Sequence, residues 1–330
     1  MSKQAITVLG AGSWGTALAI SLSRFGRDVY LFEYIPSTAE AMQQARENKK
    51  FLPDVSFPDS LHVSSDWAWV MQDNRPVVIA FPCHVVLDYL PRIAKAEPLL
   101  LIAACKGLHP ETLQRVDQWL ATSFDIERVA LLSGPSFAAE VAQGQPTATT
   151  MAAHGMSTAL AAAELFDDTN FRLYLSDDMI GVSLGGALKN VYAIAAGIAS
   201  GMGLGHNSVS ALITRGVYEM NGMIQACGGR SETVYGLSGM GDMVLTCTGG
   251  LSRNRRFGFA LAEGLTIDAA KKQVGQVVEG VRTVQAAYQL ARQHELETPM
   301  IDAVYQIINH GMTPQLALEQ LLSRPVRQEH

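Results

Sequence analysis

The sequence predicts an α/β fold in which a doubly wound, parallel sheet is followed by an all-helical domain. Short apolar runs alternate with longer amphipathic stretches from residue 5 to about residue 175. Beyond about residue 178, alanine, glycine, leucine and methionine dominate and the β-branched runs disappear. Continuous apolar runs are typical of strands covered on both faces, and strand–helix alternation gives right-handed parallel crossovers. We expect domains at 1–178 and 179–330.

Five apolar runs in the first half are expected to be strands, with helices between them. The strands are Ala5–Leu9, Asp28–Glu33, Val77–Phe81, Leu99–Cys105 and Val129–Ser133. The helices include Trp14–Phe25, Thr38–Asn48 and Thr112–Ala121. Because each helix separates two strands, the strands should run parallel.

The second half shows helical periodicity. Val281, Val284, Tyr288 and Ala291 recur at steps of three, four and three, as apolar residues do on one helix face. Two further helices are expected at Met300–Asn309 and Pro314–Ser323. The apolar stretch Val191–Gly205 is shorter than the ~20 residues of a membrane span, so we expect a buried core helix and no membrane span.

Composition excludes several classes of function. The 330 residues carry a formal net charge of −6, whereas nucleic-acid binders usually have a basic surplus. The four cysteines form no CxxC pair, which argues against a structural zinc site or a disulfide framework and favours a reducing cytoplasm. The eight histidines show no ligand spacing, so no metal is expected.

The motif Gly10-Ala11-Gly12-Ser13-Trp14-Gly15 follows the first expected strand and opens the first expected helix. Its glycines allow a tight turn, close approach of a pyrophosphate and close packing of helix on strand. The free N–H groups of the helix N-terminus then face the phosphates. These features predict a Rossmann-type dinucleotide site. Trp14 is large for such a loop and either walls the cofactor or anchors the helix in the core.

Glu33 ends the second expected strand, 23 residues after Gly10. A carboxylate there accepts hydrogen bonds from the adenine ribose hydroxyls and repels a 2′-phosphate. The sequence therefore favours NAD over NADP. In the alternative, Glu33 points to solvent and Arg27 or another base admits NADP.

Two lysines stand out. Lys189 is the only formal charge between Asp178 and Arg215. Such a lysine either reaches the surface or is held in a cleft, where burial lowers its pKa and suits it to proton transfer. Its neighbour Asn190 can orient a substrate hydroxyl. Lys106 follows the fourth expected strand and either faces the ligand crevice or is a solvated turn residue.

An arginine-containing loop follows at Thr246–Arg256. Arg253, Arg255 and Arg256 are the only charges between Asp242 and Glu263. Glycines, a serine, an asparagine and a guanidinium together suit a phosphate monoester, while a basic helix start at the surface is the alternative. A local charge of this kind in an acidic protein would attract an anionic substrate.

Taken together, these motifs resemble the NAD(P)-dependent sn-glycerol-3-phosphate dehydrogenases of the bacterial type, over nearly the whole chain. The residues that carry the resemblance are Gly10–Ala19, Lys106-Gly107, Gly134–Ala138 with Glu140-Val141, Pro146-Thr147-Ala148, Leu188-Lys189-Asn190, Gly239–Asp242 and Ser252-Arg253-Asn254. The resemblance implies a helical second domain similar to that of 6-phosphogluconate dehydrogenase, a homodimer, and reversible reduction of dihydroxyacetone phosphate that supplies phospholipid synthesis.

The resemblance also implies roles for individual residues. Lys189 matches the proton donor and acceptor, Asn190, Asp242 and Thr246 match its polar partners, and Lys106 matches a lysine that touches substrate and cofactor. The substrate-holding set is Gly134, Ser136, Ser252, Arg253 and Asn254. The cofactor contacts are Ser13, Trp14, Ala138, Arg253, Val277 and Glu279. Many bacterial members have a small residue followed by His or Arg at the positions of Glu33 and Tyr34. This chain therefore departs from them where NADP would be recognised. The same departure makes Tyr34 a weaker candidate for a contact with the adenosine of the cofactor.

Two other readings fit parts of the sequence. Another two-domain dehydrogenase, acting on a 3-hydroxyacid or a UDP-sugar, would share the Gly10–Gly15 loop but has no use for the Ser252-Arg253-Asn254 loop. A dinucleotide-binding sensor would keep the glycines but has no reason to hold Lys189 in an apolar helix. His206 follows a glycine-rich run, and its role stays open.

Overall fold

The computed structural model describes residues 4–72, 74–326 and 328. Its contacts divide the chain into two compact units. The N-terminal unit is Met1–Lys106 with Gln114–Ser183, and the C-terminal unit is Gly107–Leu113 with Leu184–His330. The short segment 107–113, which the sequence would assign to the first domain, thus groups with the C-terminal unit. The boundary expected at 178/179 stays a prediction.

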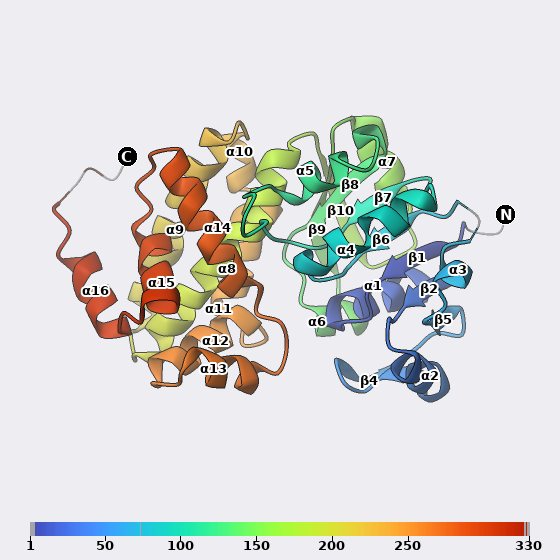
Figure 1. Cartoon of the computed structure of the whole chain (residues 1–330), viewed down its shortest axis with the longest axis horizontal. Coiled ribbons are helices and arrows are strands. Elements are labelled where there is room, and N and C mark those ends of the chain that lie inside the picture. Colours follow the sequence, from blue (N-terminus) through green and yellow to red (C-terminus); the bar gives the residue numbers. More distant parts are fainter. Residues whose placement is uncertain (1–3, 73, 327, 329–330) are drawn as a thin grey trace. The chain divides into compact units, whose positions relative to one another are not determined.

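The N-terminal unit is built on a mixed sheet (Figure 1). Among the described residues its strands are β1 (Ile6–Leu9), β2 (Val29–Phe32), β5 (Leu61–Ser64), β6 (Val77–Ile79), β7 (Leu101–Ala103), β8 (Val129–Ser133), β9 (Thr147–Ala153) and β10 (Phe171–Ser176). Their spatial order is β10-β9-β8-β7-β6-β1-β2-β5. From β5 to β8 this is the order of a doubly wound dinucleotide-binding sheet, with its switch point between β1 and β6.

All five strands expected from the sequence are confirmed, Val129–Ser133 with the same bounds and the other four with shorter ones. The expectation of a wholly parallel sheet is wrong at one edge, because β9 runs antiparallel to β8 and β10 runs parallel to β9. A separate two-stranded ribbon joins β3 (Glu47–Asn48) to β4 (Leu52–Ser56). The 3₁₀ turn η1 (Ile126–Arg128) leads directly into β8.

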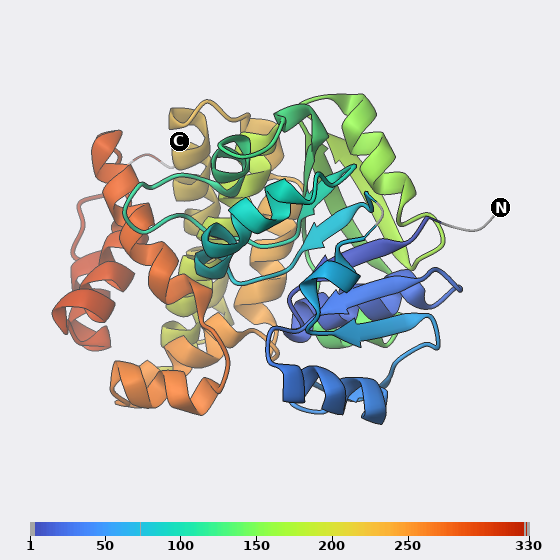
Figure 2. The same ribbon diagram turned by 45° about the vertical axis from the view of Figure 1, so that its right-hand side comes forward.

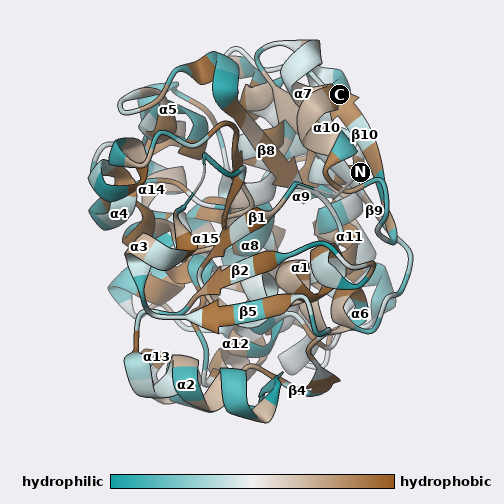
Figure 3. Cartoon of the chain, turned by 90° about the vertical axis from the view of Figure 1, so that its right-hand side faces the viewer, coloured by the Kyte–Doolittle hydropathy of each residue, from teal (hydrophilic) through white to brown (hydrophobic). Residues whose placement is uncertain are grey.

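Helices cover both faces of this sheet (Figure 2). One face packs against α1 (Ser13–Ser23), α2 (Pro36–Ala45), α6 (Ala138–Ala142) and α7 (Met156–Glu164), and the other against α3 (Trp67–Val70), α4 (Cys83–Lys95) and α5 (Val116–Ala121). Successive residues alternate between the two cores: Val8 belongs to the first and Leu9 to the second. This two-sided burial explains the continuous apolar runs. Apolar residues concentrate in the strands, and the outer turns of α2 are hydrophilic (Figure 3).

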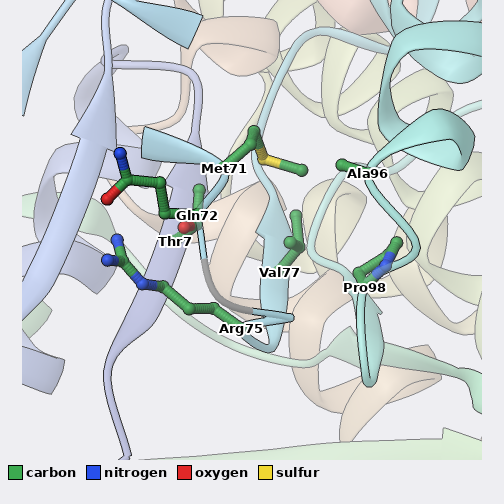
Figure 4. A pocket seen from close by; sticks show the side chains of 7 residues that line it. All are labelled: Thr7, Met71, Gln72, Arg75, Val77, Ala96 and Pro98. Carbon is green, nitrogen blue, oxygen red and sulfur yellow. The ribbon is translucent and has the colours of Figure 1, made fainter. Parts of the chain in front are cut away.

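A small hollow lies at the amino ends of β1 and β6 (Figure 4). It is lined by Thr7, Met71, Gln72, Arg75, Val77, Ala96 and Pro98. The Arg75 guanidinium carbon lies 3.7 Å from the centroid of the Tyr30 ring, which holds the arginine against the sheet. Ligands of doubly wound sheets bind at the opposite, carboxyl ends of the strands, so we assign this hollow a packing role.

Beyond Ser183, the regular elements of the C-terminal unit that the structure describes are helical. Its elements are most of α8 (Met179–Gly201), α9 (His206–Ala226), α10 (Ser231–Val234), the π-helical turn η2 (Leu237–Gly241), α11 (Asp242–Thr248), α12 (Arg253–Ala262), α13 (Ile267–Val274), α14 (Glu279–Gln293), α15 (Pro299–His310) and α16 (Pro314–Leu322). The predicted stripe lies on α14, where Val284 and Ala291 are buried and Tyr288 stacks on Tyr305 with ring centroids 3.9 Å apart.

Helix α8 is long and apolar enough to cross a membrane, but 83% of its apolar window is buried inside the fold. The expected core helix is therefore confirmed, although it starts earlier and ends at Gly201 rather than Gly205. Glycines on both helices allow α8 to pack closely on α12: a Cβ at Gly197 of α8 would lie 2.0 Å from the Arg255 carbonyl oxygen, and one at Gly258 of α12 would lie 2.1 Å from that of Ile194. The glycine-rich composition is thus explained by contact between helices.

Glu219 is a buried carboxylate on α9 that the sequence did not single out. One carboxylate oxygen accepts the Met300 N–H at 2.8 Å and the other accepts the Ile301 N–H at 3.4 Å, so Glu219 caps the start of α15. Burial raises the pKa of Glu219 to about 8, opposed by these two hydrogen bonds; the charge of Asp302 raises it further and that of Arg215 lowers it.

We expect Glu219 to make stability depend on pH. Its pKa in the folded protein lies above the ordinary value of 4.5. The folded state therefore binds the proton more tightly than the unfolded state, and this stabilisation is lost as pH rises from about 4.5 to about 8. Glu219→Gln keeps an acceptor for Met300 and cannot ionise. Thermal unfolding should show the variant more stable than the parent at pH 9, and the advantage should vanish at pH 5. An equal advantage at both pH values would contradict this assignment.

Candidate active site

The loop between β1 and α1 lies at the switch point of the sheet. Gly10 has φ +109°, and a Cβ there would stand 3.0 Å from the Phe81 backbone nitrogen, so the loops that follow β1 and β6 meet at this residue. A Cβ at Gly15 would lie 1.9 Å from the Gly10 carbonyl oxygen, so only glycine lets α1 begin so close to the loop. The first and third glycines of the motif therefore have packing roles that the structure explains.

Gly12 differs from its two neighbours in the motif. A Cβ added to Gly12 would meet nothing within 4 Å, and no side chain caps the start of α1. The backbone at the N-terminus of α1 is therefore not covered by side chains at Gly12. Such a cradle fits the pyrophosphate of a dinucleotide, because backbone N–H groups can approach the phosphates without obstruction.

Trp14 anchors α1 to the sheet. Its indole Nε1–H donates to the Ala104 carbonyl oxygen at 3.0 Å, and the ring packs against the core of the N-terminal unit. The anchoring alternative for Trp14 therefore has direct support. Its contact with cofactor stays a prediction, as does that of Ser13 beside it.

Glu33 is buried just beyond β2, and its carboxylate accepts the Ile35 N–H at 3.0 Å. Burial raises the pKa of Glu33, while hydrogen bonds from the backbone and the charge of Lys50 lower it. Arg27, the base considered as an NADP ligand, is buried and donates to the Leu165 carbonyl oxygen. The guanidinium of Arg27 thus already has a hydrogen-bond partner within the protein.

Two further predicted cofactor contacts are Tyr34, which is 66% exposed, and Ala138, which begins α6.

The ends of β7 and β8 bring Lys106, Gly134 and Ser136 together. The Gly134 carbonyl oxygen accepts from Lys106 Nζ at 3.1 Å and from Ser136 Oγ at 3.0 Å. Gly134 has φ +152°, and a Cβ there would lie 2.8 Å from Thr149 Cα on β9. Glycine is therefore required where the chain leaves β8. The antiparallel strand missed by the sequence prediction thus shapes this part of the site.

Lys189 lies in the interior of the C-terminal unit. Its ammonium donates to Asp242 Oδ1 at 2.7 Å and to Thr246 Oγ1 at 3.0 Å, and the two charged side chains are 12% and 1% exposed. Thr246 Oγ1 also lies 2.6 Å from the Asp242 carbonyl oxygen, to which it donates. The lysine is therefore held at a buried ion pair between α8 and α11, and the alternative of a surface lysine is wrong.

Cys247 borders this ion pair. Burial raises the pKa of Cys247 to about 12, with the charge of Lys189 opposing the shift and that of Asp242 adding to it. The thiol is consequently neutral beside the lysine. It neither competes for the proton of the ammonium nor adds charge to the site.

Asn190 and Asn254 bond to each other. Asn254 Nδ2 donates to Asn190 Oδ1 at 2.8 Å, and Asn254 Oδ1 accepts the Gly280 N–H at 3.0 Å. Both amides are buried. They tie α8, α12 and the start of α14 together. The sequence did not predict the hydrogen bond from Gly280 to Asn254, because every residue except proline has a backbone N–H and the bond therefore does not depend on residue type.

The loop before α12 holds Ser252 and Arg253. Ser252 Oγ caps α12 by accepting the Arg255 N–H at 3.2 Å. Burial lowers the pKa of Arg253, Glu279 opposes the shift and Arg256 adds to it. The negative charge of Glu279 thus offsets part of the cost of burying the Arg253 guanidinium. Val277, a predicted cofactor contact, is 40% exposed. His206, whose role the sequence left open, begins α9 and is exposed. The described residues hold no group of three side chains suited to a metal, and His330 lies outside them.

Comparison with known proteins identifies the family. The models for the N-terminus and the C-terminus of NAD-dependent glycerol-3-phosphate dehydrogenase match residues 5–159 and 178–319. A glycerol-3-phosphate dehydrogenase [NAD(P)+] of Mannheimia succiniciproducens is 43% identical over 100% of both chains. The chain belongs to the NAD-dependent glycerol-3-phosphate dehydrogenase family.

Two further members of this family support the assignment. A relative named glycerol-3-phosphate dehydrogenase [NAD(P)+] from Haemophilus influenzae is 43% identical over 99% of each chain. The crystal structure of glycerol-3-phosphate dehydrogenase from Coxiella burnetii has a TM-score of 0.93 at 38% identity and covers 98% of this chain and 100% of its own. The predicted family, fold class and NAD(P)-linked enzyme class are therefore confirmed.

Proposed function

We propose that this enzyme reversibly reduces dihydroxyacetone phosphate to sn-glycerol 3-phosphate with NAD(P)H. The observation that carries the proposal is the buried Lys189–Asp242 ion pair, in a family of glycerol-3-phosphate dehydrogenases. Family membership supports the reaction class, and the ion pair, which fixes the position of the Lys189 ammonium, supports this lysine as the proton donor. In the cell we propose a cytoplasmic homodimer whose product supplies phospholipid synthesis.

Lys189 is the general acid of the proposed reduction. When bound, NAD(P)H supplies a hydride to the carbonyl carbon. Negative charge then develops on the ketone oxygen, and Lys189 Nζ gives that oxygen a proton. In the reverse direction the neutral amine takes the proton from the alcohol. Asp242 and Thr246 orient the amine, and the Asp242 carboxylate stabilises the ammonium form from which the proton is donated.

The other site residues bind and orient the substrate in this proposal. Arg253 holds the phosphate through a charge-assisted hydrogen bond, with Ser252 and Asn254 beside it. Lys106 stabilises the developing charge on the ketone oxygen, while the hydrogen bond to Gly134 fixes its direction. The Asn190–Asn254 bond keeps the helices that carry Lys189 and Arg253 in register. Binding the phosphate away from the reacting carbon orients that carbon.

The test is an assay of purified enzyme with dihydroxyacetone phosphate and either NADH or NADPH. We expect NADH oxidation that requires the phosphorylated ketone, and formation of sn-glycerol 3-phosphate. Turnover of a 3-hydroxyacid or UDP-sugar in its place, or cofactor binding without turnover of any phosphorylated ketone, would refute the proposed function.

Cofactor choice gives a separate prediction. We expect a higher kcat/KM with NADH than with NADPH, because the Glu33 carboxylate repels a 2′-phosphate and the Arg27 guanidinium donates to the Leu165 carbonyl oxygen. Glu33→Ala should lower the NADH-to-NADPH ratio of kcat/KM by about tenfold or more, since it removes a charged acceptor for the ribose hydroxyls. Glu40→Ala, which removes an exposed carboxylate from α2, is the matched control. A parent enzyme that prefers NADPH would contradict this assignment.

A further inference from the structure

A small cavity borders Lys106, within the N-terminal unit. It is lined by Ala103, Cys105, Lys106, Val116, Leu131, Leu132, Ser133, Val182 and Ser183. Most of the wall is apolar, and the polar groups come from the ends of β7 and β8 and from the first turns of α8. The space open to the centre of a water molecule is about 10 Å³. One buried water requires about that volume.

Two hydroxyls in this wall are buried and unsatisfied. Ser133 is 5% exposed and Ser183 is 8% exposed. Neither Oγ has a hydrogen-bond partner among the described residues. A buried polar group without a partner costs about 1–3 kcal/mol, so two at one small cavity are unfavourable unless something bridges them.

We propose that this cavity holds one ordered water that hydrogen bonds to the hydroxyls of Ser133 and Ser183 and to the ammonium of Lys106. The water accepts from Lys106 and from one hydroxyl and donates to the other. Three partners are the usual number for a buried water. The ammonium has three N–H groups, one of which bonds to Gly134, and the water accepts from another.

The bridge makes Ser133 and Ser183 positioning residues for Lys106, a role that rests on the proposed function. Ser133 ends β8, directly before the Gly134 carbonyl that fixes the first hydrogen bond of Lys106. Ser183 lies on α8, the helix that continues to Lys189. Through the water, the strand-end loop of Lys106 is therefore connected to the first turns of α8, within the N-terminal unit. A small shift of a charged group that orients substrate is costly in rate.

The presence of the water is tested by a high-resolution crystal structure of the wild-type protein. We expect density for one water within hydrogen-bonding distance of Ser133 Oγ, Ser183 Oγ and Lys106 Nζ. A dry cavity, or serine hydroxyls turned onto backbone carbonyls, would overturn the proposal. This readout does not use activity, so it stands or falls separately from the proposed reaction.

The positioning role is tested by a double-mutant cycle. Ser133→Ala and Ser183→Ala should each lower kcat/KM for dihydroxyacetone phosphate about threefold to tenfold and leave NADH binding unchanged. In a Lys106→Ala background the same substitutions should have no further effect, because they act through that lysine. Ser21→Ala, which removes a buried serine hydroxyl from α1, borders no part of the cavity and is the matched control. Equal losses with and without Lys106 would overturn the role.

Discussion

Replacement of Lys189 by alanine should lower kcat for dihydroxyacetone phosphate reduction by at least about 10²-fold. The ammonium is the proposed proton donor, and its hydrogen bonds to Asp242 and Thr246 help to hold it in place. Cofactor binding should persist, because the nucleotide cradle at Gly12 belongs to the N-terminal unit. Steady-state kinetics and NADH fluorescence titration measure the two effects. Near-normal turnover in a folded variant would remove the acid–base role from Lys189.

The variant needs a control for folding. Without Lys189, the buried Asp242 carboxylate loses the ammonium that pairs with it, which can cost about 3–5 kcal/mol. Lys189→Ala combined with Asp242→Asn removes that charge and should restore much of the lost thermal stability. It should not restore turnover. Recovery of both together would show that the single variant was inactive only because it was unstable.

The second large effect is expected at Arg253. Arg253→Ala should raise KM for dihydroxyacetone phosphate about tenfold to hundredfold, because a hydrogen bond to a charged group contributes about 1.5–3 kcal/mol. The smaller ketone dihydroxyacetone has no phosphate, so its low turnover should be nearly unaffected when parent and variant are both saturated with NADH. Parallel kinetics with the two ketones measure this difference directly.

Arg256→Ala is the matched control for Arg253, since it removes an exposed arginine from the same helix. We expect it to change KM only slightly, through the long-range attraction of an anionic substrate, and this small effect should disappear at high salt. An unchanged KM in Arg253→Ala, or equal effects in the two variants, would assign the phosphate to other residues.

The strands predicted correctly are those buried on both faces. Val77–Ile79 and Val129–Ser133 are continuous apolar runs because both cores pack against them. The strand Phe171–Ser176 was not predicted, because it lies at the edge of the sheet, where exposed and partly buried residues mix. Thr147–Ala153 was also missed, since its threonines and alanines are small and lack a strong strand pattern. Its antiparallel direction depends on tertiary packing and has no local signal.

The site was predictable where charge stands out against its surroundings. Lys189 was singled out because a lone lysine in an apolar helix is unusual, and the structure buries it at an ion pair. Its partner Asp242 follows a glycine-rich turn and was known only from the family resemblance. Glu219 looked like any helix carboxylate, because burial of a single charge is set by the packing of distant helices. Ser133 and Ser183 were not singled out because their burial beside one cavity likewise depends on tertiary packing.

Chemical rescue tests the role of Lys189 most directly. The turnover of Lys189→Ala is measured against increasing ethylammonium and, in parallel, tetramethylammonium, which carries the same charge without a transferable proton. If Lys189 transfers a proton to the ketone oxygen, ethylammonium raises kcat in a concentration-dependent way and tetramethylammonium does not. Equal rescue by both ions, or by neither in a variant that still binds NADH, would contradict general acid catalysis by this lysine.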